Sequence, residues 1–337
     1  MTAWRIGSGV LAALSILLAA LPLADTTTAA GESVFCVPEA IEPSGMQTGA
    51  LVQQAADAAL PYRVFLPGLT RADDPPLPGP SAELLALQER LAASVQRSSV
   101  PGRFAVAVTD LQTGETIGVG RDRVQLSGCV MNLFAIIAAL RDVDAGRYPL
   151  SDVDATIRQT IWASDATAAR SLYRKVGQGD VVEGVRTVSG LLATLRMGSS
   201  SIDHPPAFPE DSIGTGANNL VTARDMNRAL GLVHSGEVLS PQLTAYLLEA
   251  MTHVKPGLNY LTAVVPAPAV VSHKNGFFWD REGWVDNDTT IVRFGPDLDH
   301  AYALTFLSEA VPTLYSDIPL GQQLVRETWE YFQATYD

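Results

Sequence analysis

The chain has 337 residues, of which 47% are hydrophobic and 18% are charged. This length and composition suit one large domain or two ordinary ones with a sizeable core, and they exclude a chain that is disordered throughout. The formal net charge is −13 and the pI is near 4.8, which argues against nucleic acid or an anionic membrane surface as a partner. We therefore interpret the acidity as a source of solubility.

The N-terminus has the pattern of an export signal. Arg5 is the only charged residue before Asp25, and the run between them is almost wholly apolar. Small residues at Thr28 and Ala30 then offer a cleavage site. The apolar run is also close to the roughly 20 residues that span a bilayer, so an uncleaved anchor is the alternative. We expect residues 1–30 to be a signal peptide or an N-terminal anchor, and the rest to lie outside the cytoplasm, whether secreted, periplasmic or at the cell surface.

Cysteine usage fits an extracytoplasmic chain. Only two cysteines occur, Cys36 and Cys129. An even count in an exported chain invites a disulfide between them, which would stabilise the fold by about 2–4 kcal/mol. Two free and unrelated thiols are the alternative.

Residues 31–80 have the composition of an extension that ends in a linker. Residues 70–81 are rich in proline and aspartate, which is typical of an extended connection. The piece before them has helix-like and apolar content and could dock on the main body. We expect the folded domain to comprise residues 81–337.

The pattern sharpens from Ser81. Residues 81–96 predict an amphipathic helix with Ser81 as its cap. The apolar face of this helix is expected to consist of Leu84, Leu85, Leu87 and Leu91. Residues 103–120 predict a hairpin of two Val- and Ala-rich strands around a turn that contains Gly114. Residues 126–140 begin a helix that is apolar on almost all sides and is therefore expected to be buried.

More helices follow, and then strand character returns. The caps are recognisable: Thr222 and Asp225 form a predicted capping pair, and Ser240 precedes Pro241 at the first helical position. The expected helices are residues 166–177, 181–195, 222–236, 240–251 and 321–336, and the expected strands are 269–276, 288–296 and 301–309. The order predicts an α+β fold in which an antiparallel sheet is formed from both ends of the chain and packed with helices, with a helical subdomain between them.

Three short motifs resemble S-x-x-K, S-D-N and K-T-G, the motif set of class A β-lactamases and penicillin-recognising serine hydrolases. The resemblance runs from about Ser81 to the C-terminus. Each motif lies in the expected element: the start of the buried helix, the start of a middle helix, and the strand that returns to the sheet. They read Cys129-Val130-Met131-Asn132, Ser164-Asp165-Ala166 and Lys274-Asn275-Gly276. The resemblance implies a β-lactamase-like fold.

The resemblance also implies a reaction, which is acyl transfer from a β-lactam or a peptidoglycan stem peptide to water. At several positions that the family uses for this reaction, however, this sequence has other residues. The family's serine needs a base one turn away, because a hydroxyl is a weak nucleophile at its own pKa. Cys129 replaces that serine and Asn132 replaces the lysine. Ala166 replaces an amide expected to hold substrate, and the family's deacylating glutamate has no clear match, since Glu210 lies in the right region but not in a recognisable setting.

Ser164 and Lys274 remain as candidate catalytic residues, with Asn275, Gly276 and Ala166 as candidate substrate-binding positions. The leading hypothesis is that hydrolysis is lost or very weak, so that the domain acts as a binding or cell-envelope module, a pseudoenzyme. A disulfide between Cys36 and Cys129 would block the nucleophile and staple the extension across the pocket mouth.

Two alternatives remain open. Cys129 could be the nucleophile itself, because a helix N-terminus and Lys274 would lower the pKa of its thiol, with Ser164 as proton relay. Against this, His273 next to Lys274 should point to the opposite face of the strand. A purely structural envelope protein with a vestigial pocket is the other alternative. We expect a monomer that needs no cofactor, and the histidines show no metal-ligand spacing.

Overall fold

The computed structural model describes residues 79–259 and 261–336. The chain divides into two compact units, residues 1–32 and 33–337, and every described residue belongs to the second. The predicted signal or anchor, Cys36 and nearly all of the predicted extension lie outside the described residues. Within the part that is described, no helix is long and apolar enough to cross a membrane.

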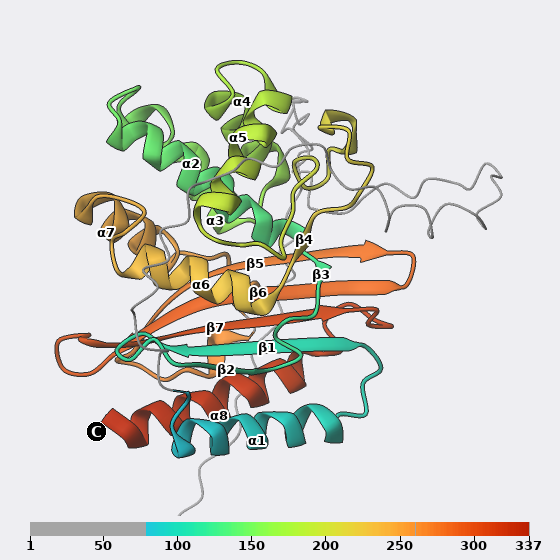
Figure 1. The fold of residues 1–337 in the computed structure, drawn as a ribbon, viewed down its shortest axis with the longest axis vertical. Helices are drawn as coiled ribbons and strands as arrows, with labels where there is room; N and C mark the ends of the chain where they lie inside the picture. Colours follow the sequence, from blue (N-terminus) through green and yellow to red (C-terminus); the bar gives the residue numbers. More distant parts are fainter. Residues whose placement is uncertain (1–78, 260, 337) are drawn as a thin grey trace, which may run out of the picture. The chain divides into compact units, whose positions relative to one another are not determined.

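A five-stranded antiparallel sheet forms the middle layer of the described unit (Figure 1). The strand order is β2-β1-β7-β6-β5, so the early hairpin lies beside the last strand. In that pairing Val106 lies opposite Phe306. The strands are β1 (Arg103–Asp110), β2 (Thr116–Val119), β5 (Val270–Asp280), β6 (Gly283–Phe294) and β7 (His300–Glu309). The predicted α+β class, with one sheet assembled from both ends of the domain, is confirmed.

Helices cover both faces of this sheet. Figure 1 shows α1 (Ala82–Arg97) and α8 (Ile318–Tyr336) together on one face and the other helices on the opposite side. These are α2 (Asn132–Asp144), α3 (Asp154–Trp162), α4 (Ala166–Val176), α5 (Val181–Thr194), α6 (Ala223–His234) and α7 (Pro241–Ala250). Because both faces are covered, the strands are buried on both sides, and all of β1 after Arg103 is buried.

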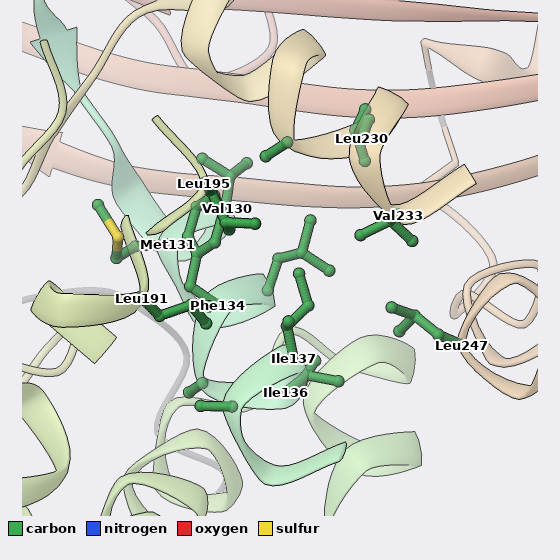
Figure 2. Packing of buried hydrophobic residues seen from close by; sticks show 14 of the residues in the cluster. Val130, Met131, Phe134, Ile136, Ile137, Leu191, Leu195, Leu230, Val233 and Leu247 are labelled. Carbon is green, nitrogen blue, oxygen red and sulfur yellow. The ribbon is translucent and has the colours of Figure 1, made fainter. Parts of the chain in front are cut away.

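Helix α2 lies in the centre of the helical layer. Ten of its 13 residues are buried, which confirms the expectation of a helix enclosed on nearly all sides. Apolar side chains of this helix and of the turn before it pack against α5, α6 and α7. Figure 2 shows Val130, Met131, Phe134, Ile136 and Ile137 facing Leu191, Leu195, Leu230, Val233 and Leu247. The motif at the start of α2 is therefore mounted on a rigid element.

Two local predictions need correction. Leu85 was placed on the buried face of α1, but its side chain is 41% exposed, because Leu84, Leu87 and Leu91 already complete the stripe that faces the sheet. The capping pair of α6 is only half formed. The Thr222 hydroxyl accepts from the Asp225 N–H at 3.1 Å, but the Asp225 carboxylate binds a neighbouring loop instead of turning back to Thr222. The Ser81 cap is confirmed, since its hydroxyl accepts from the Leu84 N–H at 3.2 Å.

Candidate functional site

Strand β5 presents the third motif to the helical layer. Consecutive side chains of a strand point to opposite faces, and here Lys274 and His273 do so. The His273 Nδ1 lies 3.1 Å from both carboxylate oxygens of Asp288 on β6, while Lys274 contacts Ser164 on the other face. The expectation that His273 points away from the Lys274 side is confirmed. His273 therefore offers no base to a nucleophile at the start of α2.

Lys274 is the most strongly perturbed side chain at this site. It is fully buried, and its Nζ donates to the Ser164 Oγ at 2.5 Å and to the Asn275 carbonyl at 2.5 Å. Burial lowers the pKa of Lys274 to about 7, and the charge of Asp288 offsets part of this effect. At neutral pH a large fraction of Lys274 is therefore uncharged.

Ser164 sits in a tight connection between α3 and α4. Its φ is +52°, a left-handed conformation that is uncommon for residues other than glycine. The Ser164 hydroxyl donates to the Asn275 carbonyl at 3.2 Å. Asp165 is a helix cap, because its carboxylate accepts from the Ala168 N–H at 2.8 Å. The connection thus aims the Ser164 hydroxyl at the backbone of β5.

The first motif begins with a 3-10 turn, η1 (Gly128–Met131), packed directly on β5. The fit is close because residue 276 is glycine: a Cβ added there would lie 2.5 Å from the backbone nitrogens of Cys129 and Val130. The amide of Asn287 also holds the approach to this turn, donating to the carbonyls of Leu126 at 2.8 Å and Ser127 at 2.9 Å. The role of Asn287 was not predicted from the sequence. Side chains alternate between the two faces all along β6, and nothing in the local sequence distinguishes Asn287 from its neighbours.

Cys129 is disulfide-bonded and fully buried. A disulfide sulfur has no thiolate and is not an acyl-transfer nucleophile. The predicted partner, Cys36, lies outside the described residues, so the pairing of Cys36 with Cys129 stays a prediction.

Asn132 occupies the position of the family's lysine one turn after Cys129. Its side chain is fully buried, and neither its Oδ1 nor its Nδ2 has a hydrogen-bond partner among the described residues. A buried amide without partners costs about 1–3 kcal/mol. An amide also cannot accept a proton at neutral pH, so this position supplies no base.

An apolar cluster lies where the first and second motifs meet. Cys129 and Ala166 are its buried members, and Ala207, Phe208 and Phe278 pack against them. A cavity of about 200 Å³ lies beside the turn that carries Cys129. Its lining comprises Ser127, Gly128, His204, Pro206, Ala207, Pro209, Asn218, Asn219, Phe278, Trp279 and Asp280. Trp279 is 46% exposed, so the cavity has an aromatic rim open to solvent.

The loop of residues 203–219 borders this cavity and is organised by Asp203. The Asp203 carboxylate accepts from the Ser212 hydroxyl at 2.6 Å and from the Thr215 N–H at 2.8 Å. Burial acts to raise the pKa of Asp203, but the hydrogen bonds from Ser212 and Thr215 outweigh it and lower the pKa overall. Glu210 in the same loop is an exposed residue paired with Arg170 at 3.6 Å. This position therefore does not support Glu210 as the residue that activates the deacylating water, the role that a glutamate has in the family.

Replacing Asp203 by alanine is expected to loosen the loop of residues 203–219. The change leaves the Thr215 N–H and the Ser212 hydroxyl without their shared acceptor, the buried Asp203 carboxylate, and we expect a loss of about 1–2 kcal/mol in the free energy of unfolding. Urea denaturation followed by circular dichroism measures it. Asp297→Ala, at an exposed position, is the control and should change stability by less than about 0.5 kcal/mol. Equal stability of the two variants would contradict the role given to Asp203.

The tertiary structure therefore brings four of the predicted residues together, namely Ser164, Lys274, Asn275 and Gly276, against the turn of Cys129. The Asn275 side chain donates to the Leu258 carbonyl at 3.0 Å and is buried. Roles in substrate binding for Ala166, Asn275 and Gly276 remain predictions. Among the residues that the structure describes, no group of three or more His, Cys, Asp or Glu side chains could hold a metal ion.

The comparisons with known proteins agree with this geometry. A family model described as the β-lactamase enzyme family matches residues 151–332, more than half of the chain. The structure of PBP-A is 20% identical with a TM-score of 0.63, covering 77% of this chain and 99% of that chain. A β-lactamase from Chitinophaga pinensis is 20% identical with a TM-score of 0.60, covering 73% of this chain and 98% of that chain.

A PBP-A mutant in an acyl-enzyme complex with penicillin G is also similar, at 20% identity and a TM-score of 0.62, covering 77% of this chain and 100% of that chain. A comparison with curated protein sequences finds no match. The sheet, the helical layer and the order of the three motifs define a class A β-lactamase-type fold. The chain belongs to the β-lactamase enzyme family.

Proposed function

We propose that this protein is an exported, β-lactamase-like binding module of the cell envelope in which hydrolysis is lost or very weak. The ligand class is β-lactams or the peptidoglycan-type peptides that they resemble. One observation carries the proposal: at the position of the family's nucleophile stands a disulfide-bonded cysteine, Cys129. Asn132 at the position of the base supports it, since its buried amide cannot take up a proton.

Export is supported by two independent features. The first is the apolar run after Arg5, and the second is the disulfide at Cys129, because disulfides persist mainly outside the reducing cytoplasm. Ligand binding is supported by the retained contact between Ser164 and Lys274 and by the cavity beside Cys129. One of the structures similar to this chain holds penicillin G as an acyl-enzyme.

The alternative is an active hydrolase with Cys129 as the nucleophile. It requires the reduced protein, because only a free thiol can form the thiolate. Burial lowers the pKa of Lys274 to about 7, so Lys274 is the candidate base that would take up the thiol proton in this alternative. A covalent penicilloyl adduct on Cys129 of the reduced protein would support this alternative over the binding module.

The experiment is a mass measurement of the intact protein after incubation with a chromogenic cephalosporin, combined with the colour change as a measure of hydrolysis. We expect no adduct and no hydrolysis above buffer for the oxidised wild type. The double variant Cys129→Ser with Asn132→Lys restores both the hydroxyl and its base, and we expect it to gain an adduct. We expect little turnover, because a deacylating glutamate is still missing from the described loop.

Cys129→Ser alone is the matched control. It has the hydroxyl without the base, so its acylation should be about 10²–10⁴-fold slower than that of the double variant. Rapid hydrolysis by the oxidised wild type would overturn the proposal. Failure of the double variant to acylate would mean that the pocket is vestigial and would favour the structural alternative.

A further inference from the structure

We propose that a row of adjoining cavities in the helical part of the domain binds a linear polymer of phosphodiester-linked polyol or sugar units. We call this row the arginine groove. It runs from Arg174 past Arg147 and Arg141 to Arg224. It shares no lining residue with the cavity beside Cys129. Ligand binding in the arginine groove is therefore independent of the proposed function.

Four cavities make up the arginine groove, and each shares lining residues with the next. The first has a volume of about 630 Å³ and shares Arg147 with the second, of about 340 Å³. The second shares Arg141 with the third, of about 130 Å³. The third shares Leu232 and Glu237 with the fourth, of about 590 Å³. Such a series of hollows suits an extended chain better than a compact ligand.

The charge of the arginine groove is opposite to that of the chain. The chain has 23 Lys and Arg residues against 36 Asp and Glu residues. Among the described residues, eight cations but only two carboxylates, Asp142 and Glu237, line the arginine groove. The net charge of the whole chain argued against anionic partners, but it conceals this local positive surface. A field of this sign attracts polyanions.

Helix ends explain only part of this gathering of cations. Arg141 lies in the last turn of α2, and Arg174 and Lys175 lie in the last turn of α4, where positive charge is favoured. Arg228 lies in the middle of α6, and Arg147 lies in the connection after α2. Because these positions are not helix ends, capping does not account for the arginine groove.

Much of the positive charge in the arginine groove is unmatched. Four exposed arginines form no ion pair with any described carboxylate: Arg141, Arg174, Arg196 and Arg228. The other four cations share three aspartates. Burial lowers the pKa of Arg121, and the charge of Arg224 adds to this, while Asp122 opposes it. An anionic ligand would relieve the repulsion between Arg121 and Arg224.

The residue types indicate which polyanion fits. Seven of the eight cations are arginines, whose planar guanidinium groups bind phosphate oxygens in pairs. Tyr148 is the only aromatic residue in the described lining, and the Lys175 Nζ lies 4.3 Å from the centroid of its ring. Single-stranded nucleic acids need several aromatic side chains on which their bases stack. A phosphodiester polymer without bases therefore fits better.

The test measures binding of end-labelled poly(glycerol phosphate) by fluorescence anisotropy. For Arg141→Glu with Arg174→Glu we expect an affinity at least about tenfold lower than that of the wild type, and a weaker dependence on salt. Arg90→Glu with Arg326→Glu is the matched control. These two residues are exposed on α1 and α8, on the opposite face of the sheet, and the change in net charge is the same. The affinity of the control should stay within about twofold of the wild type.

A second variant, Arg196→Glu with Arg228→Glu, tests another part of the arginine groove. We expect a similar loss of affinity, because one extended polymer contacts both pairs. None of these four arginines has an ion pair to lose, so both variants should keep the circular dichroism and melting temperature of the wild type. A loss in only one variant would show a local site and would overturn the groove, and so would an equal loss in the control.

Three comparison ligands test the identity of the polymer. They are polygalacturonate, which carries carboxylates, oligothymidylate, which carries bases, and vesicles of anionic phospholipid. We expect poly(glycerol phosphate) to bind more tightly than each of them. Tighter or equal binding of any of the three would overturn the assignment of a phosphodiester polymer without bases. Absence of poly(glycerol phosphate) binding at low salt would overturn the whole inference.

Discussion

Replacing Gly276 by alanine is expected to destabilise the protein by about 2–3 kcal/mol, because the added Cβ overpacks a contact between two backbones. The Cβ would lie 2.5 Å from the nitrogens of Cys129 and Val130 and 2.9 Å from the carbonyl carbon of Cys129. A flexible side chain could move aside, but here the obstacles are main-chain atoms. Asn287, the β6 residue paired with Gly276, also holds the two residues before η1, so relief requires η1 or β5 to shift.

Thermal and urea unfolding measure this effect. Gly190→Ala on α5 is the matched control, since a Cβ there meets nothing within 4 Å. Alanine is preferred over glycine in a helix, so the control is expected to gain about 0.5–1 kcal/mol. The opposite signs of the two glycine-to-alanine changes are the diagnostic result. If Gly276→Ala leaves the free energy of unfolding unchanged, the turn η1 is not packed on β5 as described.

The pair of Asp286 and Asp317 is expected to make stability fall as the pH rises. Asp286 lies on β6 and Asp317 immediately before α8, and both are 1% exposed. The Asp286 carboxylate accepts from the Tyr315 N–H at 3.0 Å. Burial raises the pKa of Asp286 to about 8, and the charge of Asp317 adds to this. Burial also raises the pKa of Asp317.

The sign follows from proton linkage. An unfolded aspartate has a pKa of about 3.9, so between pH 4 and pH 8 the folded state holds a proton that the unfolded state has released. The stability that comes with this proton is fully present near pH 4 and is lost by about pH 8. As the pH rises from 4 to 8, we expect ionisation of this pair to lower the free energy of unfolding by about 2–4 kcal/mol.

Asp286→Asn tests the pair, because it keeps an acceptor for the Tyr315 N–H and removes the titration. Urea unfolding at several pH values between 4 and 8 should show a flatter slope for this variant than for the wild type, and higher stability at pH 8. Glu330→Gln on the exposed side of α8 is the control and should keep the wild-type slope. A variant slope equal to that of the wild type would show that Asp286 is already ionised in the folded protein.

Much of the fold followed from local sequence patterns. The helix that starts after Ser81, the hairpin around Gly114 and the three returning strands were predicted from periodicity and turn residues, and the structure has them. Helix α3 was not predicted, because its nine residues have too short an apolar pattern to stand out. Leu85 was misplaced, because a run of leucines does not by itself tell which of its members faces the sheet.

Some residues of the candidate site were likewise predictable from the sequence, and others were not. The order of the motifs led to Cys129, Ser164 and Lys274, since each motif begins or ends a regular element. Asp203 and Asn287 were missed, because their roles consist of contacts with loops that are distant in sequence or irregular in structure. No local pattern marks a residue whose partners are backbone groups elsewhere in the chain.

By itself the sequence determined that the family's serine and lysine positions carry Cys129 and Asn132, and that Ser164 and Lys274 are kept. It determined these points because identity at a motif position needs no coordinates. The tertiary structure alone decided that Lys274 is buried against Ser164 at 2.5 Å, with its pKa lowered to about 7, and that Cys129 is enclosed and disulfide-bonded. Burial and pairing depend on how distant elements pack, and protonation depends on burial, so the chemical state of the site is a property of the fold and not of any motif.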